Sequence, residues 1–104
     1  MDAIEIVKTI LTLIACHLVG DYVLQSDYIA RTKGENLYHL FIHSFLYTLP
    51  FYVVFSWNWV LLVIFVMHAL IDSLKARWKL IGYAVDQIAH YVVLLFAMVI
   101  YCWF

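Results

Sequence analysis

The chain has 104 residues, of which 67% are hydrophobic and only 12% are charged, and its formal net charge is −1. This composition, with a mean hydropathy of +0.96, lies far outside the range of soluble globular domains and indicates a protein that folds in lipid. The small net charge provides no basic surface for nucleic acid, so we expect no nucleic-acid partner.

Four apolar stretches are long enough to cross a bilayer as helices, because a hydrocarbon core of roughly 30 Å needs about 20 residues. No small-residue cleavage site follows the first stretch, so we expect it to remain in the mature protein. The second contains Pro50, which should kink the helix or mark its end. A short FSWNW link then predicts a tight antiparallel hairpin of the second and third helices. The predicted helices cover Ile4–Leu24, Leu37–Phe55, Trp57–Leu74 and Val85–Phe104.

The basic residues predict how the chain is oriented in the membrane. All of them except Lys8 lie in the two segments that join the first helix to the second and the third to the fourth. The positive-inside rule places both segments in the cytoplasm and both termini outside. The stretch 72–83 has the amphipathic character of a segment along the inner surface. On the outer side we expect an aromatic belt of Trp57, Trp59, Tyr101 and Trp103.

The two cysteines are predicted to be free. Cys16 comes late in the first helix and Cys102 closes the fourth, so a disulfide would have to join opposite faces of the membrane.

A shift of 51 residues aligns nearly every polar position inside the predicted helices. The shift places His17 on His68, and Asp21 on Asp72. It also places the Glu35, Asn36 and His39 group on Asp86, Gln87 and His90. We therefore predict an all-α membrane protein, a single domain over residues 1–104, with four transmembrane helices arranged as two parallel-repeat helical hairpins. The hairpins, 1–52 and 53–104, would be related by a pseudo-twofold axis along the membrane normal, and so small a bundle should form a homo-oligomer.

Every histidine has an acidic residue or another histidine four positions away, and residues four apart lie on one face of a helix. The spacing and depth of these pairs predict that their side chains converge near the cytoplasmic face. An unpaired aspartate at the centre of a membrane helix costs roughly 2.5 to 3.5 kcal/mol on insertion scales, so a chain this short should not carry such groups without a role. The predicted cluster consists of His17, Asp21, Glu35, His39, His68, Asp72, Asp86 and His90.

Three interpretations could explain the cluster. Imidazole and carboxylate groups suit a divalent metal such as zinc, iron or manganese, and bundle helices build such centres in soluble proteins. A metal-free cluster could instead serve a proton relay or an ion or metal pathway in a transporter or channel subunit. The third interpretation is a non-enzymatic membrane interaction protein in which the polar core is structural. The outer half of the predicted bundle is almost purely apolar, which favours an enzyme over a transporter.

A metal-dependent enzyme at this depth would most simply hydrolyse a lipid-like ester or phosphoester, because a metal activates water and polarises the substrate. Two polar residues, His43 and Gln25, have no counterpart in the second repeat, which indicates that function is concentrated in the first. We predict catalytic roles for His43, Asp21 and Gln25, although His43 fits equally well as a hydrogen-bond partner of a ligand. Three cationic side chains have two possible roles: they determine the topology, or they contact an anionic lipid headgroup. They are Arg31, Lys75 and Arg77.

Four motifs in fixed order, "HLVGDYVLQ", "HLFIH", "HALIDSLKAR" and "DQIAH", extend this pattern over nearly the whole chain. The chain resembles the small prokaryotic membrane-protein family catalogued as domain of unknown function 3307. The resemblance implies a multi-pass inner-membrane protein of bacterial or phage origin, and it implies no particular activity. The signature it implies consists of His17, Asp21, Gln25, His39, His43, His68, Asp72, Lys75, Asp86, Gln87 and His90.

Overall fold

A computed structural model describes residues 2–55 and 59–103, without the side chains of Cys102 and Trp103. All regular structure in these ranges is helical, which confirms the predicted all-α class. Four helices are long and apolar enough to cross a membrane: Ala3–Val23, Leu37–Phe55, Trp59–Ala76 and Tyr83–Tyr101. The secondary structure runs in the order α1 (Ala3–Leu18), η1 (Val19–Val23), α2 (Asp27–Thr32), α3 (Leu37–Phe55), α4 (Trp59–Ala76) and α5 (Tyr83–Trp103).

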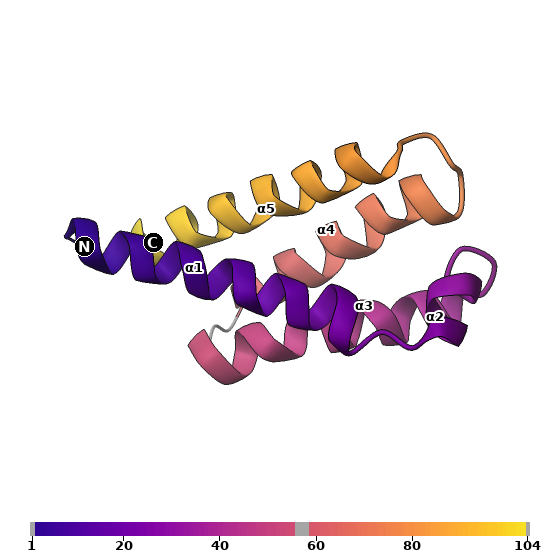
Figure 1. Cartoon of the computed structure of the whole chain (residues 1–104), viewed down its shortest axis with the longest axis horizontal. Coiled ribbons are helices and arrows are strands. Elements are labelled where there is room, and N and C mark those ends of the chain that lie inside the picture. Colours follow the sequence, from indigo (N-terminus) through magenta and orange to yellow (C-terminus); the bar gives the residue numbers. More distant parts are fainter. Residues whose placement is uncertain (1, 56–58, 104) are drawn as a thin grey trace.

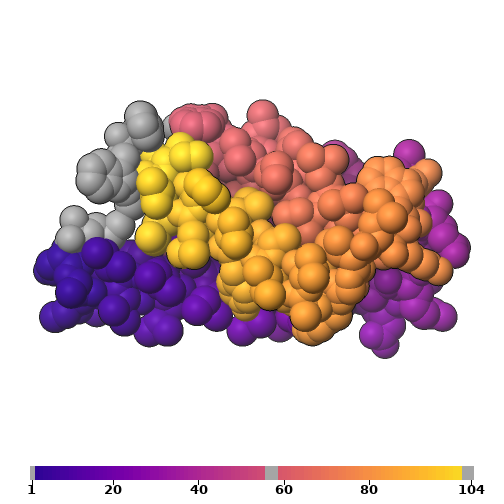
Figure 2. Space-filling model, turned by 90° about the horizontal axis from the view of Figure 1, so that it is seen from above, coloured from indigo at the N-terminus to yellow at the C-terminus, as the bar shows by residue number. Residues whose placement is uncertain are grey.

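The long helices form an elongated bundle in which successive helices run in opposite directions (Figure 1). Both chain ends lie at one end of the bundle, called here the terminal end. The segment around α2 and the connection between α4 and α5 lie at the other end, called here the loop end. On the face shown in Figure 2, α5 lies between α1 and α4. The described residues form one body of 43 × 24 × 22 Å.

The apolar core occupies the terminal half of the bundle, and much of the outer surface is apolar as well. Large side chains on every long helix remain exposed, for example Leu62 and Phe96. An apolar exterior around a packed interior is what lipid contact requires of a bundle. The core side chains are Leu13, Cys16, Tyr47, Phe51, Val60, Ile64, Leu94 and Ala97.

Most predicted helix boundaries agree with the structure, and the second range agrees at both ends. Pro50 does not end α3, which continues to Phe55. The first helix closes as a π-helix, η1, in which the Leu24 amide donates to the Val19 carbonyl oxygen at 2.9 Å. Among the described residues, Cys16 is buried and free, as predicted.

Two connecting segments differ from a simple loop. Residues Asp27–Thr32 form α2, a short helix that hydropathy did not predict, capped by the Ser26 hydroxyl, which accepts from the Ile29 amide at 3.1 Å. The predicted surface segment 72–83 begins as the last part of α4, with Asp72 buried, and residues 77–82 then form an irregular connection rather than a helix.

Several predictions fall on parts of the chain outside the described residues. The middle of the FSWNW link, including Trp57, is one of them, and the side chains of Trp103 and Cys102 are others. The pseudo-twofold relation of the two hairpins and the orientation of the bundle in a membrane stay predictions.

Candidate metal centre

A cluster of buried ionisable side chains lies between the long helices, toward the loop end. Each member exposes 6% or less of its surface, although ionisable groups are rarely buried so completely without a partner. The cluster combines α1, η1, α3, α4 and α5, and it contains four imidazoles and three carboxylates. Its members are His17, Asp21, His43, His68, Asp72, Asp86 and His90. We call this set the buried cluster.

The π-helix η1 positions Asp21 in the buried cluster. A π-turn adds a residue to the helical turn, and such turns occur frequently at functional sites. The turn also presses Gly20 against α3, where a Cβ atom at Gly20 would lie 2.9 Å from the Cα and the carbonyl oxygen of Tyr47. The absence of a side chain at Gly20 therefore lets the backbone that carries Asp21 approach the helix that carries His43.

Three sets of three side chains in the buried cluster have the spacing of metal ligands. In each set, one potential ligand atom per residue lies within 4.8 Å of the other two. The sets overlap, because each pair of sets shares one residue. They are Asp21, His43 and His68; His68, Asp72 and His90; and Asp21, Asp86 and His90.

His68 lies at the centre of the cluster with neither ring nitrogen hydrogen-bonded to a described residue. His68 is 1% exposed, and its ring stacks on Tyr47, at 3.8 Å between centroids, and contacts His90, at 4.4 Å. Buried ring nitrogens that lack a partner are unfavourable, and water or an ion often explains them. His68 is thus the residue whose environment most clearly calls for a ligand.

His43 contacts the carboxylates of two helices at once. Its Nε2 lies 3.2 Å from Asp21 Oδ1 and 3.4 Å from Asp72 Oδ2, without hydrogen-bond geometry to either. On the other side of the cluster, His90 Nε2 lies 3.3 Å from Asp86 Oδ1. Imidazole nitrogens and carboxylate oxygens therefore face one another across a small volume.

Gln87 fixes the orientation of His17. The Gln87 Nε2 donates to Asp21 Oδ2 and to Asp86 Oδ2, each at 3.1 Å, so its Oε1 faces His17 Nε2 at 2.9 Å. We infer from this geometry that Nε2 carries the His17 proton, which leaves Nδ1 to accept from the Tyr47 hydroxyl at 2.7 Å. Both ring nitrogens of His17 are satisfied in this arrangement, so His17 supports the cluster through hydrogen bonds.

Two lysines partly balance the buried carboxylates. Lys33 is 5% exposed, and its Nζ lies 2.9 Å from Asp72 Oδ2, while Lys75 Nζ lies 3.8 Å from Asp86 Oδ2. With all three aspartates ionised, two ammonium groups would leave a deficit of one positive charge. A proton on a histidine or a bound cation would remove that deficit, and buried carboxylates require such compensation.

Comparison with known proteins places the chain in a family. A family model described as "Protein of unknown function (DUF3307)" matches residues 9–104. The chain belongs to the DUF3307 family. This match confirms the resemblance seen in the ordered polar motifs, and it covers every member of the buried cluster. No curated protein and no solved structure matches this DUF3307 chain.

Six of the eight predicted ligands of the DUF3307 chain lie together in the buried cluster, and two do not. Glu35 is exposed and precedes α3. His39 is only partly buried, and its Nδ1 lies 2.6 Å from the Thr32 hydroxyl. The described structure therefore does not bring Glu35 and His39 to the positions that their aligned partners Asp86 and His90 occupy.

Of the three predicted catalytic residues, His43 and Asp21 belong to the buried cluster, and Gln25 lies at its edge. The Gln25 Nε2 donates to the Asp21 carbonyl oxygen at 3.2 Å, and its Oε1 accepts from Lys33 Nζ at 2.8 Å. Gln25 thus holds Lys33 against the cluster.

Sequence reasoning misses one member of this environment, Lys33. The sequence connects Lys33 only with the orientation of the chain, because nothing in it shows that the α2 region turns this side chain inward. Tyr47 follows His43 by four residues, so the spacing predicts that the two share one face of the helix, and Tyr47 does lie against the cluster.

Proposed function

We propose that the protein binds divalent metal in the buried cluster and uses it to hydrolyse a lipid-like ester or phosphoester. The observation that carries the proposal is the pair of unbonded ring nitrogens of buried His68, within ligand distance of groups from three other helical elements. Imidazole and carboxylate donors in this combination suit zinc, iron or manganese.

The overlapping ligand sets favour a centre of two metal ions. Asp21 belongs to the set with His43 and His68 and also to the set with Asp86 and His90. A carboxylate has two oxygens and can bridge two ions, as in the carboxylate-rich centres of soluble bundles. Two metal ions, if bound, would therefore share Asp21, and the other ligands would be His43 and His68 for one ion and Asp86 and His90 for the other.

Asp72 is available for proton transfer in this assignment. It is outside both Asp21-bridged sets, yet its Oδ2 lies near His43 and Lys33. Bound metal would supply an activated water and polarise the substrate. Asp72 would accept the proton, and Lys33 would keep this carboxylate ionised before the transfer.

The packing of the terminal half favours an enzyme over a transporter. Beyond the buried cluster toward the terminal end, the buried polar side chains among the described residues are Ser44, Tyr47 and Thr48 of α3, and the rest of the core is apolar apart from Cys16. An ion pathway needs polar groups or a wet cavity along its length, and the described core of the terminal half offers no such series of groups.

Metal analysis of the detergent-purified protein tests the centre. We expect about two divalent ions per chain, and we expect His68→Gln and Asp21→Asn to lose most of this metal. His39→Gln is the matched control, because His39 lies outside the three ligand sets. Size-exclusion chromatography and circular dichroism would establish that the variants are folded. A wild-type protein without metal above background would overturn the proposal.

An activity assay tests the hydrolysis. Protein loaded with zinc, iron or manganese should release product from a phosphatidic acid or a phospholipid ester in mixed micelles. Asp72→Asn should lower kcat by on the order of 100-fold or more while it keeps the metal. Equal loss of activity in His39→Gln would contradict the assigned site.

A further inference from the structure

A second site opens at the loop end, directly beside the buried cluster. It is a cavity of about 360 Å³ between the α2 region and the end of α4. The chain has six lysines and arginines, and four of them line this cavity, together with one acid, Glu35. The four are Arg31, Lys33, Lys75 and Lys79. We call this cavity the basic pocket.

The geometry of the basic pocket depends on close backbone contact. A Cβ atom at Gly34 would lie 2.3 Å from the carbonyl oxygen of Ala76, so only glycine lets these two segments form the wall. Lys79 has a φ of 55°, which is an unfavourable conformation for a residue with a side chain. Such strain persists where the surrounding structure maintains it, often at functional sites.

Two lysines belong to the basic pocket and contact the buried cluster as well. Lys33 lines the pocket and contacts Asp72, and Lys75 lines the pocket and contacts Asp86. An anion in the pocket would therefore lie against cations that also touch the proposed metal centre. Several cations lining one small cavity favour a phosphate group, which offers oxygen acceptors and negative charge.

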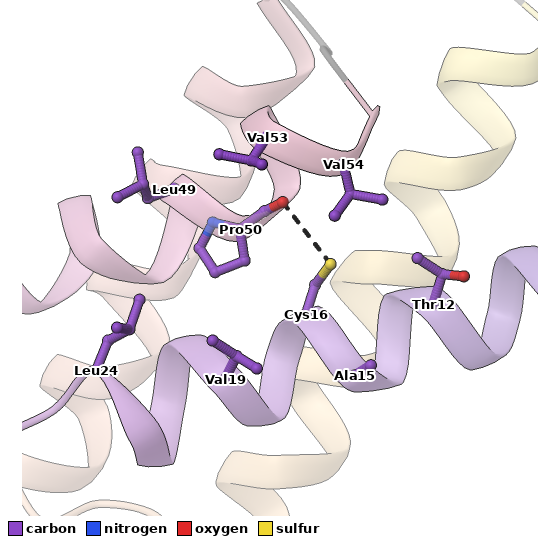
Figure 3. A pocket seen from close by; sticks show the side chains of 9 residues that line it. All are labelled: Thr12, Ala15, Cys16, Val19, Leu24, Leu49, Pro50, Val53 and Val54. Carbon is purple, nitrogen blue, oxygen red and sulfur yellow. Dashed lines mark hydrogen bonds between the residues drawn. The ribbon is translucent and has the colours of Figure 1, made fainter.

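An apolar groove and the basic pocket are lined by neighbouring residues of one segment. The groove has a volume of about 410 Å³ and lies between the first membrane helix and the second half of α3. Figure 3 shows its side chains on both helices around a shared space, with the Cys16 thiol donating to the Pro50 carbonyl oxygen at 3.8 Å. Leu24 lines the groove and Gln25, the next residue, lines the basic pocket.

The groove has the position and chemistry of an acyl-chain site. The residues that line it on the first helix run from Thr12 to Leu24, which corresponds to roughly 18 Å along the axis. Both of its walls belong to helices apolar and long enough to cross a membrane. A single amphiphile could therefore place its charged head among the lysines and its chain in the groove.

We propose that the protein binds an anionic lipid with a terminal phosphate, with the phosphate in the basic pocket and one acyl chain in the apolar groove. This proposal names the substrate class of the proposed hydrolase and rests on that function for turnover. Lipid binding itself requires no metal, because none of the four cations is a member of the proposed ligand sets.

Native mass spectrometry of the full chain in detergent tests binding with phosphatidic acid, phosphatidylcholine and inorganic phosphate as separate probes. Phosphatidic acid should bind more tightly than phosphatidylcholine, and Arg31→Gln and Lys79→Gln should each weaken it about fivefold. Both residues are exposed, so neither change should affect folding. Lys8→Gln, an exposed lysine on α1 outside the pocket, is the matched control.

A second pair of variants tests the groove. Ala15→Phe should fill it and weaken phosphatidic acid binding at least fivefold, whereas Ala3→Phe, exposed on the same helix outside the groove, should leave it unchanged. Inorganic phosphate binding that depends on Arg31 and Lys79, together with lipid binding indifferent to Ala15→Phe, would overturn the proposal in favour of a soluble anion. Equal binding of phosphatidic acid and phosphatidylcholine would overturn it too.

The metal-free variant His68→Gln separates this proposal from the proposed hydrolysis. It should still bind phosphatidic acid while it fails to hydrolyse the lipid. Binding of lipid by a protein that never binds metal would refute the hydrolase and leave the lipid site standing. A metal-loaded protein that binds phosphatidic acid and phosphatidylcholine equally well would refute the lipid site and leave the metal centre standing.

Discussion

At the scale of single residues, the contact between Lys33 and Asp72 is a consequential polar pair outside the two sets that share Asp21. The two side chains are 5% and 1% exposed, and Gln25 holds the ammonium group from the other side. A buried ion pair contributes little net stability relative to an apolar pair, but removing one partner leaves a charge without compensation. The pair therefore makes the fold sensitive to single changes.

Lys33→Met should lower the free energy of unfolding by about 3 to 5 kcal/mol, because Asp72 would remain buried without its cation. The measurement is unfolding in detergent followed by circular dichroism. The double variant Lys33→Met with Asp72→Leu should recover most of this stability, since neither charge remains. Lys8→Met, which removes an exposed lysine, should have almost no effect. A double variant no more stable than Lys33→Met would contradict the pair as the cause.

The residues also show how far the sequence could predict the site. The spacing of four residues predicts that His17 and Asp21 share one helix face, and the two side chains do lie close together. The same spacing does not place Glu35, His39 and His43 on one face, because each step of four residues advances about 40° around the helix axis. Along α3 the buried face contains His43 and Tyr47, and His39 has already turned toward α2.

At the scale of helices and turns, close packing at two glycines determines how the segments meet. Gly20 lets η1 approach α3, and Gly34 lets the segment before α3 approach the end of α4. Neither glycine has a positive φ, so the requirement is for space and not for an unusual backbone conformation. Hydropathy carries no information about such close backbone contacts. The sequence therefore predicted the long helices but not the geometry of the loop end.

Gly34→Ala should destabilise the protein by about 1 to 3 kcal/mol, because the new methyl group would overlap the Ala76 carbonyl and must displace backbone. It should also weaken phosphatidic acid binding, since the wall of the basic pocket would move. Gly82→Ala is the matched control, as no atom lies within 4 Å of the added Cβ position. Thermal unfolding in detergent would compare the two, and equal melting temperatures would show that the close contact is unimportant.

At the scale of the whole molecule, the polar and apolar halves of the bundle are separated along its length. The buried cluster and the basic pocket lie toward the loop end, while the apolar core occupies the terminal half. This arrangement was predictable in outline, because the histidines and the aspartates spaced four residues from them lie toward one end of each apolar stretch. The repeat of 51 residues does not predict that Lys33, in the loop of the first half, contacts the buried cluster.

Proteoliposomes containing the purified protein should show no movement of protons or of divalent metal above that of empty liposomes, because the apolar core offers no polar pathway through the terminal half. A pH-sensitive dye and a metal-sensitive dye trapped inside the vesicles would measure the two fluxes. A flux that His17→Ala abolishes would contradict the assignment as an enzyme and support transport.

The position of the chain ends has a practical consequence. Because α1 begins and α5 finishes at the same end of the bundle, an affinity tag or fluorescent protein attached to either would stand away from the basic pocket. A protein immobilised through such a tag would expose the basic pocket to the solution. Two fluorescent tags, one at each chain end, would report by energy transfer that the two ends are close together.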